Sequence, residues 1–333
     1  MKKTFFLFAT IISIIFFCGL QSTIFADDGF VLEVPKFKGC KAKCVSPNKQ
    51  RPQGQKGLQG QQNPKHKAQS TNTPALRHST NFTNPSSIIA LSPAITEIIY
   101  ALGAGDEIIA VSDFCNYPPE AKKKQKVGGA INPSYEQVLV SKPDLIIYQG
   151  LMVKIKKFCE NYKIQTYNVQ LDNWETITNS IQQIGNKIGY SKSAIKLRNQ
   201  MAEKWNKIRN IAVKKIPVPV LICVGRESGP VASCTTIGKN SFINEALTIA
   251  GGSNVCEDVI GAYPTISAEI ISSRQPAIIF ELRPGQKINA DQIIKEWEIL
   301  NKKSKVIILT NDYLMVPGPR ITKIAEEFRK KLK

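Results

Sequence analysis

One pattern of residues occurs twice in this chain. The first copy, INPSYEQVLVSKPDLII, occupies positions 131–147, and the second, YPTISAEIISSRQPAIIF, occupies positions 263–280. When Glu136 is aligned with Glu269, each copy has a Ser two residues before the Glu, a Pro seven residues after it, and then an aliphatic run. A repeat with identical spacing predicts two units of similar build within the chain.

Alternating strand and helix patterns surround both copies. The first half begins with a β-rich run, IIAL, a helical stretch, PAITEIIYALGAG, ended by Gly103, and a second run, EIIAV. The second half repeats this order, with the runs VPVLICV, AIIFEL and KVIILTND and a helical segment ended by Gly251 and Gly252. Because strands that alternate with helices form parallel sheets, we expect an α/β fold of two similar lobes with parallel central sheets.

A long helical stripe separates the two halves. Its apolar residues step by three or four positions, as one face of a helix requires; they are Ala194, Leu197, Met201, Trp205, Ile208 and Ala212. Ser191 is a candidate N-cap, and Pro217 lies just beyond the end. About 24 residues at about 1.5 Å each span roughly 36 Å, enough to run along both lobes. The expected domains are an N-terminal lobe, a connecting backbone helix and a C-terminal lobe, at 87–188, 189–216 and 217–333.

The N-terminus has the three regions of a secretory signal. Two lysines precede an apolar run, and the small residue Ala26 follows it. We expect residues 1–26 to be a signal peptide that directs the chain to the periplasm. The run at 5–25 is also long enough to serve as an uncleaved membrane anchor. A lipid on Cys18 is a third alternative, disfavoured by the two bulky phenylalanines just before it.

Residues 27–86 are rich in Gln, Lys, Pro, Gly and Asn and have few periodic apolar residues, which predicts a basic, disordered tether. The whole chain carries a formal net charge of +19. Part of that surplus lies in the tether, so contact with an acidic envelope surface is an alternative to a simple solvated spacer. Nucleic acid is not an expected partner, because the basic stretch has no interleaved aromatic residues to stack bases.

Histidines and cysteines restrict the chemistry of the lobes. Both histidines, His66 and His78, lie in the expected tether, so the lobes contain no histidine. This argues against a serine hydrolase, a zinc hydrolase and a histidine-lined receptor for free metal ions. Among the cysteines, a disulfide between Cys234 and Cys256 is the first choice if any pair forms in an oxidising compartment.

Several motifs resemble those of a known protein family. The stretch 88–147, with LSPAITE, YPPEA and KVGG, looks very like the first lobe of substrate-binding proteins of ABC importers for cobalamin, iron-siderophores and haem. The similarity extends over about 245 residues and includes YPTISAEII and PGPRI near the C-terminus. It implies the class III periplasmic binding protein fold, a monomer, and an ABC permease dimer with its ATPase subunits as partners.

The family resemblance also gives the repeated glutamates a role. In these receptors one surface Glu from each lobe contacts arginines on the two permease subunits. By motif position those carboxylates are Glu136 and Glu269. One acidic contact on each lobe suits a two-fold symmetric partner with matching basic residues.

The ligand is expected between the lobes, where loops follow the carboxyl ends of the strands. The candidate ligand-binding residues in these loops are Ser92, Pro93, Phe114, Tyr117, Ala130, Asn132 and Gln149 in the first lobe and Arg226, Tyr263, Arg283 and Tyr313 in the second. Aromatic side chains would cover a flat macrocycle, and the two arginines could neutralise carboxylates or phosphate.

The ligand itself is expected to be a metal chelate. Cobalamin receptors of this family resemble one another in having tryptophans where this chain has Ala130 and Gln149, whereas Phe114 keeps an aromatic residue at a third matching position. We expect a corrinoid first, with a ferric siderophore or haem as the alternative. No catalytic residue, resident metal or cofactor is expected; an exported α/β enzyme that modifies such a chelate is the competing class.

Overall fold

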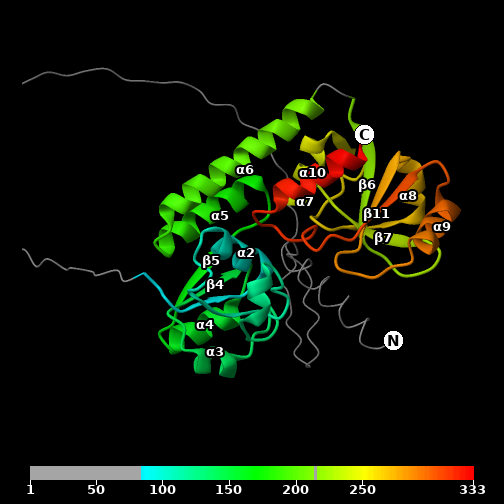
Figure 1. Cartoon of the computed structure of the whole chain (residues 1–333). Coiled ribbons are helices and arrows are strands. Elements are labelled where there is room, and N and C mark those ends of the chain that lie inside the picture. The colour runs from blue at the N-terminus through cyan, green and yellow to red at the C-terminus, as the bar shows by residue number, and fades with distance from the viewer. Residues whose placement is uncertain (1–83, 214–215) are drawn as a thin grey trace, which may run out of the picture. The chain divides into compact units, whose positions relative to one another are not determined.

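The computed structural model describes residues 84–213 and 216–333. The predicted signal peptide and nearly all of the predicted tether lie outside the described residues. No helix in the described ranges is long and apolar enough to cross a membrane. Within these ranges the chain forms two sheets with helices around them, drawn from cyan to green and from yellow-green to red in Figure 1.

The first lobe has a five-stranded sheet in the order β3-β2-β1-β4-β5, with every pairing parallel. Its strands are β1 (Ile88–Ala90), β2 (Ile108–Val111), β3 (Gln125–Lys126), β4 (Leu145–Gln149) and β5 (Gln165–Val169). Its helices are α2 (Pro93–Ala101), the 3-10 helix η1 (Pro119–Lys123), α3 (Tyr135–Ser141), α4 (Val153–Asn161) and α5 (Trp174–Lys187). The strands β1 and β4 are almost wholly buried, as expected for a sheet that is covered on both faces.

The second lobe has a six-stranded sheet in which β11, β10, β6, β7 and β9 follow in order and β8 pairs with β6. Its strands are β6 (Val218–Gly225), β7 (Ser233–Thr236), β8 (Gly252–Asn254), β9 (Thr265–Ser267), β10 (Ile278–Leu282) and β11 (Lys305–Leu309). Its helices are α7 (Phe242–Ala250), α8 (Ala268–Arg274), α9 (Ala290–Leu300) and α10 (Ile321–Lys331).

The second sheet is mixed rather than purely parallel. The strand β7 runs antiparallel to both β6 and β9. The loop 226–232 between β6 and β7 contains no helix, has Gly229 at a φ of 103°, and reverses the chain direction without a crossover helix. The predicted fold class, two similar α/β lobes joined by one long helix, is confirmed, with this local departure in the second lobe.

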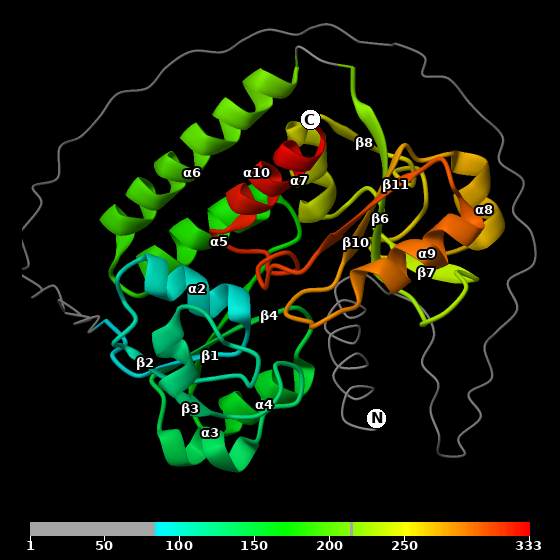
Figure 2. The same ribbon diagram turned by 45° about the vertical axis from the view of Figure 1, so that its right-hand side comes forward.

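The helix α6 (Ser191–Ala212) connects the lobes, and in both views it runs alongside α5 (Figure 2). Its buried residues are Ala194, Met201, Trp205, Ile208 and Ala212, so the predicted stripe faces the core, with Leu197 partly buried beside it. The Trp205 ring stacks on Trp174 of α5, with centroids 4.1 Å apart. Ser191 is the first helical residue rather than the N-cap, because the chain enters the helix at Tyr190.

One apolar core extends from the first lobe into the second. It includes Ile98 of α2, Ile181 of α5, Trp205 of α6, Phe242 of α7 and Phe328 of α10. The α5–α7 contact is also polar, because the Trp174 backbone N–H donates to the Glu245 carboxylate at 2.5 Å. Shared packing of this kind holds the two lobes together through the layer of helices beside them.

The expected disulfide is absent among the described cysteines. Cys234 and Cys256 are both free and buried, as are Cys115, Cys159 and Cys223. The prediction of a Cys234–Cys256 bond is therefore wrong. Cys223, Cys234 and Cys256 pack in one apolar cluster on the α8 and α9 side of the second sheet.

Candidate ligand-binding site

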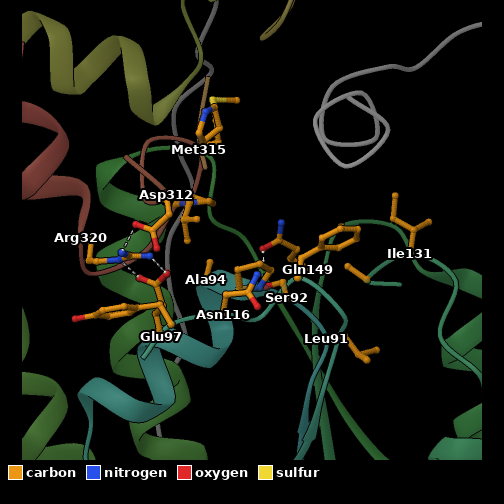
Figure 3. A pocket seen from close by; sticks show the side chains of 18 of the residues that line it. Leu91, Ser92, Ala94, Glu97, Asn116, Ile131, Gln149, Asp312, Met315 and Arg320 are labelled. Atoms are coloured by element: carbon orange, nitrogen blue, oxygen red, sulfur yellow. Dashed lines mark hydrogen bonds and ion pairs between the residues drawn. The ribbon is translucent and has the colours of Figure 1, made fainter. Parts of the chain in front are cut away.

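A cavity of about 340 Å³ lies where loops of both lobes meet, within the size range of small-molecule sites. Most of its wall follows the carboxyl ends of β1, β2 and β4 in the first lobe, and the segment 312–320 supplies much of the rest (Figure 3). The lining residues are Leu91, Ser92, Pro93, Ala94, Glu97, Phe114, Asn116, Tyr117, Ala130, Ile131, Gln149, Gly150, Leu151, Met152, Pro284, Gly285, Asp312, Met315, Val316, Pro317 and Arg320.

The Ser92 hydroxyl joins the ends of two neighbouring strands. Ser92 follows β1 and is the N-cap of α2, where its Oγ accepts a hydrogen bond from the Ile95 N–H at 3.2 Å. The same hydroxyl donates to Oε1 of Gln149, the last residue of β4, at 3.2 Å. Because β1 and β4 are adjacent parallel strands, their last residues meet at one edge. This edge presents uncharged polar groups to the cavity.

The loop after β2 brings Phe114 and Tyr117 to the same cavity. The Lys126 ammonium ties this loop to β3, donating to the Cys115 carbonyl at 3.0 Å and to the Ser112 carbonyl at 3.5 Å. Burial raises the pKa of the Cys115 thiol, so this side chain is neutral and holds the loop as a packed group. The two aromatic rings therefore project from a well-supported loop.

The second lobe reaches the cavity through an ion-paired arginine. Arg320 precedes α10, and its guanidinium donates to both carboxylate oxygens of Glu97 on α2, at 2.8 and 2.5 Å. Its third contact is Asp312, which accepts from Nη1 at 2.9 Å. The guanidinium lies 3.9 Å from the centroid of the Tyr117 ring and 5.3 Å from that of Tyr313. Glu97 and Arg320 thus join the two lobes directly beside the cavity.

Burial dominates the electrostatics of this pair. Glu97 is only 4% exposed, and desolvation raises the pKa of its carboxyl above the ordinary 4.5 even though Arg320 acts in the opposite direction. The pKa of Arg320 is raised by its two carboxylate partners, which outweigh its own burial. Figure 3 shows this charged group well apart from the Ser92–Gln149 pair. The cavity therefore has a charged end and an uncharged polar region.

Six of the eleven predicted ligand-binding residues line the cavity; they are Ser92, Pro93, Phe114, Tyr117, Ala130 and Gln149. The other five are not among its lining residues; they are Asn132, Arg226, Tyr263, Arg283 and Tyr313. Tyr313 lies close by, because its ring faces Arg320. The first-lobe expectations thus agree with the cavity far better than those of the second lobe.

Both expected ligand arginines are used inside the second lobe instead. Arg226 has a side chain that is 1% exposed, and it pairs with Glu281 at 3.0 Å and Glu296 at 2.8 Å. Arg283 donates to the same Glu281 carboxylate at 2.6 Å. Neither arginine lines the cavity, contrary to expectation, because a buried carboxylate on β10 holds both of them.

Sequence reasoning missed Glu97, Asn116 and Arg320 as cavity residues. Glu97 lies within LSPAITE and Arg320 within PGPRI, two motifs on which the family resemblance rests. The sequence therefore marked both positions, but it did not show that the two side chains pair. They are 223 residues apart in the chain, and nothing local connects them. Asn116 lies between the predicted Phe114 and Tyr117 and belongs to the same loop.

The two repeated glutamates are exposed and occupy equivalent places. Glu136 lies in the first turn of α3 and Glu269 in the first turn of α8, each helix being seven residues long. The N-cap is Ser134 in one copy and Ser267 in the other. The Ser267 hydroxyl lowers the pKa of the Glu269 carboxyl below its ordinary 4.5.

The ends of the two repeated helices also match. Lys142 and Gln275 each close their helix in the left-handed region, with φ of 48° and 46°, immediately before a proline. The following strands, β4 and β10, both begin nine residues after the glutamate. The repeat in the sequence therefore encodes the same helix, cap and strand twice.

Comparisons with known proteins agree with this architecture. The chain is 26% identical over 250 residues to a Vitamin B12-binding protein of Photorhabdus laumondii, a match that covers 74% of this chain and 88% of the relative. It is 30% identical over 251 residues to the uncharacterized ABC transporter substrate-binding lipoprotein YvrC of Bacillus subtilis, which covers 73% of this chain and 78% of that protein.

A solved structure from Staphylococcus epidermidis, titled a "possible" iron-binding (periplasmic solute-binding) protein, is also similar. It superposes with a TM-score of 0.64 and 26% sequence identity, over 75% of this chain and 99% of that one. The family model described as "Periplasmic binding protein" matches residues 88–312, which is more than half of the chain. With two α/β lobes on one backbone helix, the class III architecture, this chain belongs to the periplasmic binding protein family.

Proposed function

We propose that this chain is the substrate-binding component of an ABC importer, which captures a corrinoid between its two lobes and delivers it to the membrane permease. The observation that carries the proposal is the cavity between the strand-end loops of the first lobe and the segment 312–320 of the second. Phe114 and Tyr117 offer aromatic surface to a flat ring, and Gln149 offers an amide to its polar edge. The similarity to a Vitamin B12-binding protein supports this ligand class.

A ferric siderophore or haem is the second candidate ligand. The similar structure from S. epidermidis, which is named a "possible" iron-binding protein, favours an iron chelate. Such a ligand would use the same cavity and the same route of delivery. The two candidate functions therefore differ only in the ligand that is bound, and both are receptor functions.

The proposed receptor binds its ligand without changing it. The similar proteins are named as binding or substrate-binding proteins, which supports a role outside catalysis. An exported enzyme that modifies the chelate would return a different molecule. Recovery of the bound chelate after dissociation, followed by mass spectrometry, separates the two classes: an unchanged mass supports the receptor.

We propose Glu136 and Glu269 as the permease-docking residues. Both carboxylates are exposed, and each occupies the first turn of an equivalent helix on its own lobe. Two acidic groups so placed suit a permease dimer that offers one basic group from each subunit, with ATPase subunits completing the importer. Beside Glu136, the Tyr135 ring stacks on Phe158 with centroids 4.5 Å apart, which holds this part of the surface rigid.

We propose that the protein works as an exported monomer without a resident cofactor. Similarity to a substrate-binding lipoprotein supports export and leaves an anchored form as the alternative to a cleaved signal peptide. Mass measurement of the protein isolated from its native cells distinguishes a cleaved, an anchored and a lipidated N-terminus. Binding to acidic vesicles with and without residues 27–86 tests envelope contact through the tether.

Equilibrium dialysis against cyanocobalamin, haem and ferric siderophores tests the ligand. The visible absorbance of these chelates gives a direct readout. The three tryptophans are poorer reporters, because Trp174 and Trp205 stack on each other, Trp297 is fully buried, and none of them lines the cavity. Tight binding of cyanocobalamin is the expected result. Binding of an iron chelate alone would support the second candidate, and binding of none would contradict the receptor proposal.

An uptake experiment tests the docking glutamates. In cells with the native permease, the double variant E136A/E269A should abolish import of the bound chelate and leave its Kd unchanged, because neither side chain lines the cavity. The matched control is E120A/E298A, which removes one exposed carboxylate from each lobe outside the repeats and should leave import intact. Loss of binding in E136A/E269A would refute the docking role.

A further inference from the structure

We propose that this cavity selects uncharged or cationic chelates and excludes anionic ones, and that Asp312 sets this selectivity. The inference rests on the proposed receptor function, because it names the class of chelate that the same cavity accepts. It is carried by the way in which the charged groups at one end of the cavity pair with one another (Figure 3).

The guanidinium at this end is already paired with two carboxylates. Among the described residues that line the cavity, Arg320 is the only one with a cationic side chain. Its Nε and Nη2 donate to Glu97, its Nη1 donates to Asp312, and the Tyr117 ring covers one face at 3.9 Å. Three of its five N–H groups are thereby used, and a carboxylate or phosphate on a ligand would meet a cation whose charge two carboxylates already offset.

The two acidic partners of Arg320 differ in their access to the ligand. The Glu97 side chain is 3% exposed, whereas the Asp312 side chain is 57% exposed. Asp312 therefore presents negative charge to the cavity, and it shares its cationic partner, Arg320, with Glu97. A ligand with negative charge near this end meets repulsion from Asp312, which solvent screens in part because this side chain is partly exposed.

The two arginines of the second lobe that were expected to bind the ligand do not reverse this balance. Arg226 is buried against Glu281 and Glu296, and Arg283 is bonded to Glu281. Both lie outside the cavity lining. The net charge of +19 on the whole chain is therefore a poor guide to this cavity, whose lining has two carboxyl groups and one guanidinium.

The rest of the wall suits a neutral guest that carries amides. Ser92, Asn116 and Gln149 supply uncharged hydrogen-bonding groups, and Phe114 and Tyr117 supply aromatic surface. A corrinoid with amide side chains or a neutral or cationic ferric trihydroxamate fits these groups. Haem, with two carboxylates, and ferric catecholates, with several negative charges, would bring anionic groups to a cavity that has no spare cation.

Matched ligand pairs test the proposal. One pair is cyanocobalamin and its monocarboxylate derivative, in which one side-chain amide is replaced by a carboxylate. The other is a cationic ferric trihydroxamate and its succinylated, anionic form. We expect the anionic member to bind the full-length protein about tenfold more weakly than its partner when the Kd is measured at low ionic strength. The ratio should shrink as salt is added, because salt screens the repulsion from the partly exposed carboxylate.

The variant D312N identifies the residue responsible. It keeps the shape of the side chain, removes the exposed negative charge and should lower the ratio of the two Kd values by about threefold or more. The matched control D291N removes an exposed aspartate from the start of α9, outside the cavity lining, and should leave the ratio unchanged. Circular dichroism of both variants confirms that they are folded.

The outcomes separate this inference from the proposed function. Equal binding within both pairs, tighter binding of the anionic members, or tight binding of haem alone would overturn the charge selectivity and leave the receptor function standing. An unchanged ratio in D312N would overturn the role of Asp312. Failure of the folded protein to bind any chelate would overturn the proposed function, and the selectivity would fall with it.

Discussion

The two lobes place different chemistry at the same edge of similar sheets. In the first lobe the ends of β1 and β4 carry Ser92 and Gln149, an uncharged pair that faces the cavity. In the second lobe the end of β10 carries Glu281, which is fully buried and surrounded by positive charge. The first edge therefore presents polar side chains to the cavity, whereas the charged side chains of the second edge pair with one another and only Pro284 and Gly285 of the following loop line the cavity.

The edge of the second lobe is a network of buried ion pairs. The Glu281 carboxylate accepts hydrogen bonds from Arg226 at 3.0 Å and from Arg283 at 2.6 Å, and the Trp297 indole N–H donates to it as well. Burying a lone carboxylate is costly, and these donors offset that cost only together. A duplicated architecture therefore leaves each edge free either to line a ligand site or to hold buried ion pairs.

Removal of the Glu281 charge should have the largest effect on stability. The variant E281Q keeps the shape of the side chain and leaves two buried guanidinium groups without their shared counter-charge, so we expect a loss of about 3–5 kcal/mol in the free energy of unfolding. Urea denaturation at pH 7 measures it. The control E298Q removes an exposed carboxylate from α9 and should change stability by less than about 0.5 kcal/mol. If E281Q lost no more stability than E298Q, the Glu281 ion pairs would not stabilise the second lobe.

Cutting the contact between the lobes should have the next largest effect. The variant R320M leaves the buried Glu97 carboxylate without its guanidinium, and we expect it to lose about 3 kcal/mol of stability at pH 7. R320K keeps the charge but not the bidentate geometry and should lose less. Equal losses in the two variants would show that packing, rather than charge, supports this contact.

The pH dependence of R320M has a definite sign. Burial already raises the pKa of Glu97 above 4.5, and removal of Arg320 takes away an interaction that lowers it. A raised pKa in the folded state means that the stabilisation is fully present below pH 4.5 and is lost as the pH rises through the folded-state pKa. R320M should therefore be closer to the wild type in stability at pH 4.5 than at pH 7. A constant difference across this range would contradict a buried Glu97 carboxylate.

These contrasts explain which parts of the molecule could be predicted from sequence. The stripe on α6 was predictable, because burial of one helix face follows directly from residue spacing. Ser92 and Gln149 were predictable as cavity residues, because they directly follow or end strongly apolar strands. Arg226 and Arg283 satisfied the same rule and still do not line the cavity.

The reason for that difference lies in contacts between distant residues. A strand-end position predicts that a side chain reaches the edge of the sheet, but its partner decides whether it faces a ligand. For Arg226 the partners are Glu281, 55 residues away, and Glu296 on α9. For Arg320 the partner is Glu97 on the other lobe. Local patterns can place each member of such a pair, but they do not show that the pair forms.

The smallest effect is expected at the open edge of the first lobe. The variant S92A removes the N-cap of α2 and the hydrogen bond to Gln149, and we expect it to lose about 1 kcal/mol of stability, the usual value for a lost cap. The matched control is S141A, whose hydroxyl donates only to the Gln137 carbonyl within an exposed helix and should cost less. Urea denaturation of both variants gives the comparison.

The variants S92A and E281Q together distinguish an effect on ligand binding from an effect on stability alone. Without the Ser92 hydroxyl, the Gln149 amide loses a hydrogen bond that fixes its orientation at the cavity. We therefore expect S92A to weaken binding of the preferred chelate as well as to lower stability. E281Q, measured where it remains folded, should bind that chelate like the wild type, because Glu281 does not line the cavity. If E281Q lost affinity and S92A kept it, the strand ends of the second lobe, rather than those of the first, would form the main ligand contacts.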